Sequence, residues 1–90
     1  MYEILYIDEV VNEDLPDILE PWKSEIRKAI ESKLMTRPEA YSRPLRRSLK
    51  GYRKLKVGDY RIVLAIEDKV VKVFAIQHRS VVYQTAPKRL

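Results

Sequence analysis

The sequence predicts a small α+β domain, in which an N-terminal strand and one or two helices pack on a twisted antiparallel sheet and a short helix ends the chain. Its 90 residues are enough for one hydrophobic core and too few for two. An apolar stripe at helical spacing occupies the first half, and three strand-like runs separated by short turns occupy the second. The expected order of elements is β-α-α-β-β-β, followed by the short helix, within one domain that spans residues 1–90.

The first twenty residues are expected to hold a strand and little helix. Residues 1–8 are rich in tyrosine, isoleucine and leucine, which prefer a pleated, partly buried surface. Residues 9–20 are acidic and contain Pro16, which has no N–H for a helix interior but suits a first turn. We therefore expect only a short helix that begins near Pro16.

A longer amphipathic helix is predicted to follow Pro21. Its apolar residues recur at helical spacing, and charged residues occupy the other positions. Pro21 suits the first turn of this helix, and Pro38 prevents the helix from continuing far past Thr36. The residues at helical spacing are Trp22, Ile26, Ala29, Ile30 and Leu34, and we assign the stripe of Trp22, Ile26, Ile30 and Leu34 to the core.

The second half is predicted to form an antiparallel meander. Gly58-Asp59 fits a two-residue type II′ hairpin, because glycine adopts the positive φ of the first corner, and a second short hairpin is expected around Asp68. The middle run is apolar on both alternating faces apart from Arg61, as expected of a central strand that is covered on both sides. The predicted strands are residues 52–57, 60–66 and 70–77.

Two less regular segments flank this meander. Residues 37–50 are a basic connector in which Leu45 and Leu49 are expected to anchor the chain on the core. Residues 80–90 are expected to form a short final helix that is interrupted or ends near Pro87.

Charge is distributed unevenly along the chain. Residues 1–33 carry nine acidic and four basic side chains, whereas residues 34–90 carry four acidic and fourteen basic ones. The basic second half predicts a polyanionic partner, although a surface rich in lysine and arginine also serves solubility. The chain has no cysteine, which excludes a disulfide framework and thiolate metal sites and suits a cytoplasmic location.

Several other classes of protein are disfavoured. The longest apolar run, residues 62–66, is far shorter than the roughly 20 residues of a membrane helix. No signal segment, nucleotide-binding loop, metal cluster or serine triad is apparent. We therefore expect no cofactor, no metal and no membrane association.

A series of short motifs runs in order from Pro38 to Arg89 without long gaps. The motifs are Pro44-Leu45, Leu49-Lys50-Gly51, the run from Leu55 to Arg61, the trio Ile76, His78 and Arg79, then Val82-Tyr83 and Lys88-Arg89. This ordered set resembles the RelE/ParE superfamily of toxins from bacterial type II toxin–antitoxin systems. The resemblance implies a RelE-like fold, with helices on a twisted antiparallel sheet, and an antitoxin that wraps the toxin.

The resemblance leaves more than one activity open. RelE-like members cleave mRNA, commonly in the ribosomal A site, whereas ParE-like members inhibit DNA gyrase, and the fold alone does not separate them. Both strand lysines, together with His78 and Tyr83, favour a metal-independent endoribonuclease that inhibits translation. A gyrase inhibitor that acts by protein binding, or a low-activity relative, is the alternative. The expected partners are an antitoxin, mRNA and the ribosome, with a monomeric toxin inside a toxin–antitoxin hetero-oligomer.

Lys54 and Lys56 are the first candidates for a catalytic role. Side chains two apart on a strand share a face and lie about 7 Å apart, so both lysines can flank one phosphate. By the resemblance, they occupy the basic positions that RelE-like nucleases place around the scissile phosphate. Lysine at position 56 replaces the arginine of many relatives, which keeps the charge and loses the bidentate grip. A solvated strand face is the alternative interpretation.

Arg61 is the single charge within an apolar strand. A desolvated guanidinium requires a partner, and Asp59, Glu67 or water is expected to serve in the free protein. In a working ribonuclease, the guanidinium would hold the phosphate as negative charge grows in the transition state. A structural ion pair is the alternative.

His78, Arg79 and Tyr83 complete the predicted catalytic set. Imidazole takes or gives a proton near neutral pH, and His78 is the only histidine of the chain. Tyr83 is predicted either to share in proton transfer or to stack on an RNA base, and packing on the sheet is the alternative. We leave open which group is the base for the ribose 2′-hydroxyl and which is the acid for the departing 5′-oxygen.

Other cations are expected to contact the RNA backbone. Leu64 and Val81 stand where many relatives carry a tyrosine and an acidic residue, and neither departure removes a proposed catalytic group. The predicted RNA-binding residues are Arg46, Arg47, Lys50, Arg53, Lys88 and Arg89.

Overall fold

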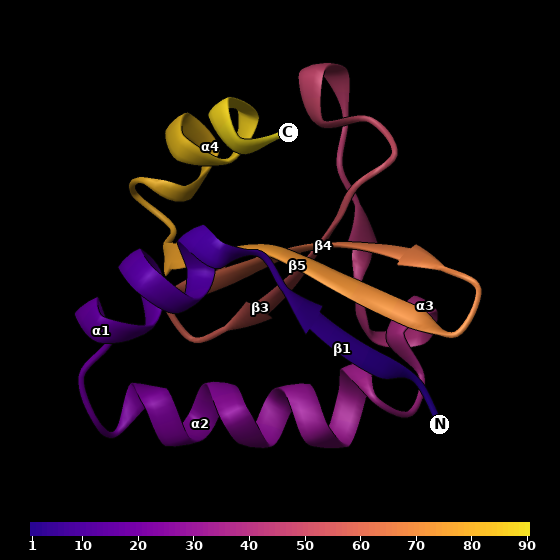
Figure 1. Cartoon of the computed structure of the whole chain (residues 1–90), viewed down its shortest axis with the longest axis horizontal. Coiled ribbons are helices and arrows are strands. Elements are labelled where there is room, and N and C mark those ends of the chain that lie inside the picture. The colour runs from indigo at the N-terminus through magenta and orange to yellow at the C-terminus, as the bar shows by residue number, and fades with distance from the viewer.

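The computed structural model describes all residues from Met1 to Leu90 and contains one five-stranded sheet with helices on both faces (Figure 1). The strand order is β1-β5-β4-β3-β2. β1 runs parallel to β5, and the other neighbouring strands are antiparallel. The strands are β1 (Glu3–Tyr6), β2 (Arg43–Pro44), β3 (Arg53–Val57), β4 (Tyr60–Glu67) and β5 (Val70–His78).

The predicted α+β class and the meander of β3, β4 and β5 are confirmed. The sheet is mixed rather than purely antiparallel, because β1 pairs alongside β5 in parallel and the short β2 adds an edge next to β3. β4 lies at the centre of the sheet, as the apolar pattern on both of its faces predicts. The bounds of the meander strands differ from the predicted ones by a single residue at some ends.

Both meander turns are two-residue loops. Val57 pairs with Tyr60 across Gly58-Asp59, and Gly58 has φ of 58°. A side chain at this position would also collide with the ring of Trp22, so the turn needs glycine for two separate reasons. In the second turn, Asp68 takes the positive φ, at 56°.

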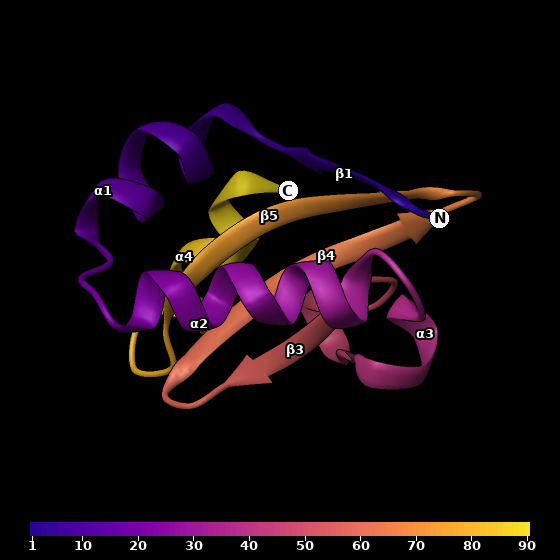
Figure 2. The same ribbon diagram turned by 90° about the horizontal axis from the view of Figure 1, so that it is seen from below.

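One face of the sheet is covered by α2 (Trp22–Ala29), which continues as the wider turn η2 (Ile30–Leu34) (Figure 2). The helix begins directly after Pro21, as predicted. The predicted stripe is buried against the sheet, apart from Trp22, which is half-buried and packs at the edge of the same core. The buried members of this core are Val10, Ile18, Ile26, Ala29, Ile30, Leu34, Leu55, Ile62, Leu64, Val71, Val73 and Ile76.

The helical segment before α2 differs from the prediction. Helical turns form η1 (Val10–Asp14) and α1 (Leu15–Asp17), so the helix precedes Pro16 and ends just after it. Val10 and Asp14 lie one turn apart and are both buried, which means that tertiary packing fixes this segment. The short helix at Pro16 was therefore expected, whereas the helical turn η1 that precedes it was not.

The opposite face of the sheet carries short elements only. The C-terminal α4 (Val82–Thr85) and η4 (Ala86–Arg89) lie across the sheet from α2, as does the turn η3 (Arg47–Leu49) (Figure 1). They share a second apolar cluster with the sheet, formed by Leu49, Val63, Ala75, Val82 and Ala86. The connector before η3 also contains a short helix, α3 (Pro38–Tyr41). No helix in the structure has the length and apolar character needed to cross a bilayer.

Candidate functional site

Three of the predicted catalytic side chains share one face of the sheet. Lys54 and Lys56 alternate on β3 with Leu55, which is buried in the core beneath α2, so both lysines project from the opposite face. Arg61 is paired in register with Lys56 and lies on the same face, because its neighbour Ile62 points into the core beneath α2. We call Lys54, Lys56 and Arg61 the cationic face.

Arg61 is held by backbone carbonyls rather than by a carboxylate. Its Nη1 donates to the carbonyl oxygens of Gly58 at 2.8 Å and Tyr60 at 2.9 Å. The expected carboxylate partners, Asp59 and Glu67, do not pair with it. The guanidinium is therefore oriented without loss of its charge, and Nε and Nη2 make no hydrogen bond within the protein. These two nitrogens offer the planar fork that suits a phosphate.

The structure does not bring His78 to the cationic face. His78 is paired in register with Tyr60, and the two ring centroids lie 5.9 Å apart in an edge-on arrangement. Tyr60 in turn packs against Trp22 of α2, with centroids 5.7 Å apart. The imidazole therefore lies on the α2 side of the sheet, and the six predicted catalytic residues do not all share one face. The position on β5 that faces the lysines and Arg61 belongs to Gln77, which is paired with Arg61.

The hydrogen bonds of His78 fix its neutral tautomer. Nδ1 accepts the backbone N–H of Ser80 at 3.1 Å and lies 2.8 Å from the Ser80 hydroxyl oxygen. A nitrogen that accepts a backbone N–H carries no hydrogen of its own, so the neutral ring carries its hydrogen on Nε2. Neutral His78 thus presents a hydrogen-bond donor, rather than a base, at its outer nitrogen.

Arg79 and Tyr83 lie in surroundings that differ from each other: Arg79 pairs with Asp59, and Tyr83 is exposed on α4. The backbone N–H of Arg79 donates to the Asp59 carbonyl at 2.8 Å, and its Nε lies 3.5 Å from the Asp59 carboxylate. Both side chains of this pair are about 60% exposed, so the ion pair contributes little to stability. Tyr83 is exposed on α4, directly after the buried Val82, which packs on the same side of the sheet as the cationic face. Tyr83 is therefore the predicted proton-transfer group that shares a side with Lys54 and Lys56.

Two of the six predicted RNA-binding residues are engaged in structural contacts. Arg53 donates from Nε to the Ser42 hydroxyl at 2.7 Å and from Nη2 to the Glu39 and Ser42 carbonyls at 3.1 and 3.0 Å. Arg89 has a side chain that is only 6% exposed and is paired with Asp14. We therefore correct both assignments to structural ones. The predicted RNA-binding residues that stay exposed are Arg46, Arg47, Lys50 and Lys88.

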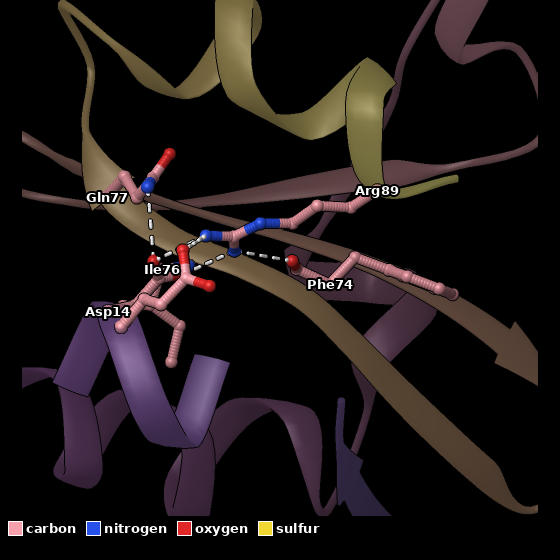
Figure 3. A network of polar contacts seen from close by, with 6 residues as sticks. Asp14, Phe74, Ile76, Gln77 and Arg89 are labelled. Carbon is pink, nitrogen blue, oxygen red and sulfur yellow. Dashed lines mark hydrogen bonds and ion pairs between the residues drawn. The ribbon is translucent and has the colours of Figure 1, made fainter. Parts of the chain in front are cut away.

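Asp14 is a buried carboxylate that the sequence analysis did not predict (Figure 3). Its carboxylate accepts two hydrogen bonds from the Arg89 guanidinium, at 2.8 and 2.9 Å, and one each from the Ile76 backbone and the Gln77 amide, at 2.9 and 3.1 Å. The hydrogen bond with Asp14 raises the pKa of Arg89, against the opposing effect of burial. Asp14 sits among many other acidic residues in the sequence, so only its spacing of one helical turn from Val10 hints at burial.

One mostly apolar hollow lies away from the cationic face. It has a volume of about 610 Å³ and lies between α2 and β1, with mostly apolar walls that include Ile4, Ile26 and Ile30. No group of acidic, histidine or cysteine side chains is arranged to hold a metal ion. The hollow also carries Lys23 and Arg27 on its wall, but none of the predicted catalytic residues lines it.

A small mixed sheet, backed by one long helix and carrying a cationic face on the side of a C-terminal helix, defines a basic α+β domain. Residues 5–83 match the family model described as the ParE toxin of type II toxin–antitoxin system, parDE, and the chain belongs to this family.

Individual relatives agree with this assignment. The chain is 38% identical over 58 residues to Toxin RelE of Mycobacterium tuberculosis (strain ATCC 25618 / H37Rv), a match that spans 62% of this chain and 60% of that toxin. Thus less than two thirds of that toxin's length is matched.

Solved structures share the fold. The crystal structure of the toxin–antitoxin complex RelBE2 from Mycobacterium tuberculosis contains a chain with a TM-score of 0.79 and 23% identity, over 88% of this chain and 92% of that one. The crystal structure of YafQ from E. coli strain BL21(DE3) has a TM-score of 0.59 and 18% identity, over 92% of this chain and 99% of that one. At these identities the likeness establishes the fold, and the choice of activity depends on the side chains described above.

Proposed function

We propose that this protein is the toxin of a type II toxin–antitoxin pair and acts as a metal-independent endoribonuclease on mRNA at the ribosome, which inhibits translation. The observation that carries the proposal is the cationic face, where Arg61 is oriented by two carbonyls and keeps two nitrogens free beside Lys56. The 38% identity to a RelE toxin supports the same choice.

The proposed reaction is an attack of the ribose 2′-oxygen on the neighbouring phosphorus. The new O2′–P bond forms as the P–O5′ bond breaks, the 2′-hydroxyl loses its proton, and the departing 5′-oxygen receives one. The products are a 2′,3′-cyclic phosphate, which can open to a 3′-phosphate, and a 5′-hydroxyl. Arg61 and the lysines stabilise the negative charge that develops on the phosphorane.

The position of His78 limits which side chains we propose for the two proton transfers. Because the imidazole lies on the α2 side of the sheet, the two proton transfers are assigned to the groups on the other side, namely Tyr83, Lys54 and Lys56. In this proposal His78 does not contact the phosphate; it packs against Tyr60 where β4 and β5 pair.

A gyrase inhibitor is the second candidate function. Two observations favour it: the family model that matches the chain is that of ParE, and His78 is separated from the cationic face. In this case the exposed cations would contact a protein surface, and no RNA bond would be broken.

The proposed partners follow from the charge of the face. An antitoxin with acidic residues would cover Lys56 and the exposed arginines around η3, in a hetero-oligomer that contains monomeric toxin in the cytoplasm. The structural neighbour from the RelBE2 toxin–antitoxin complex supports the existence of such a partner.

Sequencing of RNA 5′ ends after brief induction of the toxin separates the two candidate functions. The ribonuclease predicts new 5′-hydroxyl ends within coding regions and no early DNA damage response. A DNA damage response without new RNA ends would replace the ribonuclease with the gyrase inhibitor.

A further inference from the structure

The C-terminal half of β5 has no strand beside its outer edge. β1 pairs with residues 70–73 only, and the last hydrogen bond of that ladder runs from the Ile7 N–H to the Val73 carbonyl at 3.2 Å. Beyond this point, a carbonyl and an N–H of β5 face outward in a buried region, where an unpaired backbone group is costly. Some other part of the chain must therefore satisfy them.

Asp14 and Arg89 take the place of the missing strand (Figure 3). The Asp14 carboxylate accepts the Ile76 N–H at 2.9 Å, and the Arg89 guanidinium donates to the Phe74 carbonyl at 3.0 Å. One side chain comes from η1 and the other from η4, so residues 75 positions apart close the same strand edge.

The two side chains also form a buried, bidentate ion pair with each other. Their side chains are 1% and 6% exposed, and both carboxylate oxygens of Asp14 accept from Arg89. Removal of one partner leaves the other as an unpaired buried charge, which is strongly unfavourable. The pair therefore binds η4 to the sheet far more firmly than an exposed ion pair would.

η4 follows α4 without a break, so this anchor also acts on α4. Val82 and Ala86 on either side of Tyr83 pack in one cluster with Val63, the residue that is paired with Lys54. The position of α4, and with it that of Tyr83 on the same side of the sheet as the cationic face, thus depends on two things: the apolar contacts of α4, and the attachment of η4 at its far end.

We propose that Asp14 and Arg89 are a positioning pair that locks the C-terminal helices on the sheet and so holds Tyr83 on the same side of the sheet as Lys54 and Arg61. The effect on RNA cleavage rests on the proposed function, whereas the effect on the position of α4 does not. The pair touches no RNA and acts through Tyr83.

Lys88 provides a matched comparison for Arg89. The two cations are adjacent on η4, but Lys88 is exposed and Arg89 is buried. Arg89→Met and Lys88→Met remove the same unit of charge from neighbouring positions. A difference between them in the mobility of α4 therefore reports the anchor and not the general loss of positive charge.

The test combines hydrogen exchange of the free protein with cleavage kinetics. In Arg89→Met, we expect the amides of α4 to exchange at least about tenfold faster, while those of β3 and β4 keep their protection. The kcat for RNA should fall about tenfold or more, with a much smaller change in KM. Lys88→Met should leave the exchange of α4 unchanged and raise KM.

A milder variant keeps the test decisive if Arg89→Met does not fold. Arg89→Lys retains the charge but loses the bidentate fork, and it should show the same selective exchange of α4 with a smaller change, about twofold to fivefold. Wild-type exchange of α4 in Arg89→Lys and in any folded Arg89→Met would overturn the proposal. Faster exchange of α4 in a protein that never cleaves RNA would support the anchor and refute the ribonuclease.

Discussion

Tyr60 and His78 face each other across β4 and β5, with their ring centroids 5.9 Å apart and their planes nearly perpendicular. This contact places the single histidine on the α2 side of the sheet, on the ring of Tyr60 that also packs against Trp22, and on the face opposite to Lys56 and Arg61. The catalytic work of the proposed ribonuclease is therefore assigned to the cationic face and Tyr83. The edge-on contact instead ties the end of β5 to the core.

Substitution of His78 should therefore have a smaller effect than substitution of Tyr83. Tyr83→Phe removes the phenolic proton on the side of the sheet that carries the cationic face and should lower kcat about 10²-fold or more, within the range of general acid–base catalysis. His78→Asn keeps a side-chain acceptor near the Ser80 N–H and should lower kcat less than about fivefold. Single-turnover cleavage of a short RNA measures both, and a larger loss in His78→Asn than in Tyr83→Phe would contradict the assignment.

Removal of the Arg61 guanidinium should abolish most activity without unfolding the protein. Because Arg61 is bound to carbonyls of its own turn and not to a buried carboxylate, Arg61→Ala leaves no unpaired buried charge. We expect kcat to fall about 10²- to 10³-fold, as for the loss of one donor to a developing oxyanion. Arg37→Ala, at an exposed arginine outside the site, is the control and should retain normal kcat and thermal stability.

Substitution of Lys56 and substitution of Arg53, both on β3, should have different effects on the salt dependence of RNA binding. Lys56 is exposed on the cationic face, so Lys56→Ala should reduce the slope of log affinity against log salt by about 1. Arg53 is occupied by Ser42 and Glu39, so Arg53→Ala should leave the slope unchanged and lower the free energy of unfolding by about 1–3 kcal/mol. RNA titrations between low and moderate salt test the first expectation, and an equal slope for Lys56→Ala and wild type would count against it.

The two glycines of the chain should differ in their tolerance of alanine. Both have positive φ, but only at Gly58 would an added Cβ meet the Trp22 ring, while Gly51 has open space. Gly51→Ala should cost about 1–2 kcal/mol from backbone strain, and Gly58→Ala should cost about 1–3 kcal/mol more from the clash. Urea denaturation of both variants measures this difference. Similar losses for the two variants would show that Trp22 does not hold the turn.

Features that depend on local pattern were predictable from the sequence. The α2 stripe, the Gly58 turn and the central position of β4 all follow from periodicity within a single segment. The parallel pairing of β1 with β5 was not predictable, because it joins segments nearly 70 residues apart and residues 1–8 alternate imperfectly. The helix before Pro16 was missed because its stability comes from the burial of Val10 and Asp14, a tertiary contact.

Some features of the site were likewise predictable from local sequence pattern, and others were not. Strand alternation was enough to place Lys54 and Lys56 on one face, since it needs only the order of residues in β3. The position of His78 depends on how β5 pairs with β4, and this register contains an irregularity between Val63 and Leu64 that no local pattern shows. The roles of Arg53 and Arg89 depend on distant partners, so the sequence shows their charge but not their burial.

The most direct test of the central claim is the chemistry of the RNA ends that the purified protein makes on ribosome-bound mRNA in the presence of EDTA. We predict cleavage that leaves 5′-hydroxyl ends, with 2′,3′-cyclic phosphate or 3′-phosphate ends opposite them, and at least about a hundredfold slower cleavage by Arg61→Ala. Intact mRNA with the wild-type protein, together with inhibition of purified gyrase by the same sample, would contradict the account.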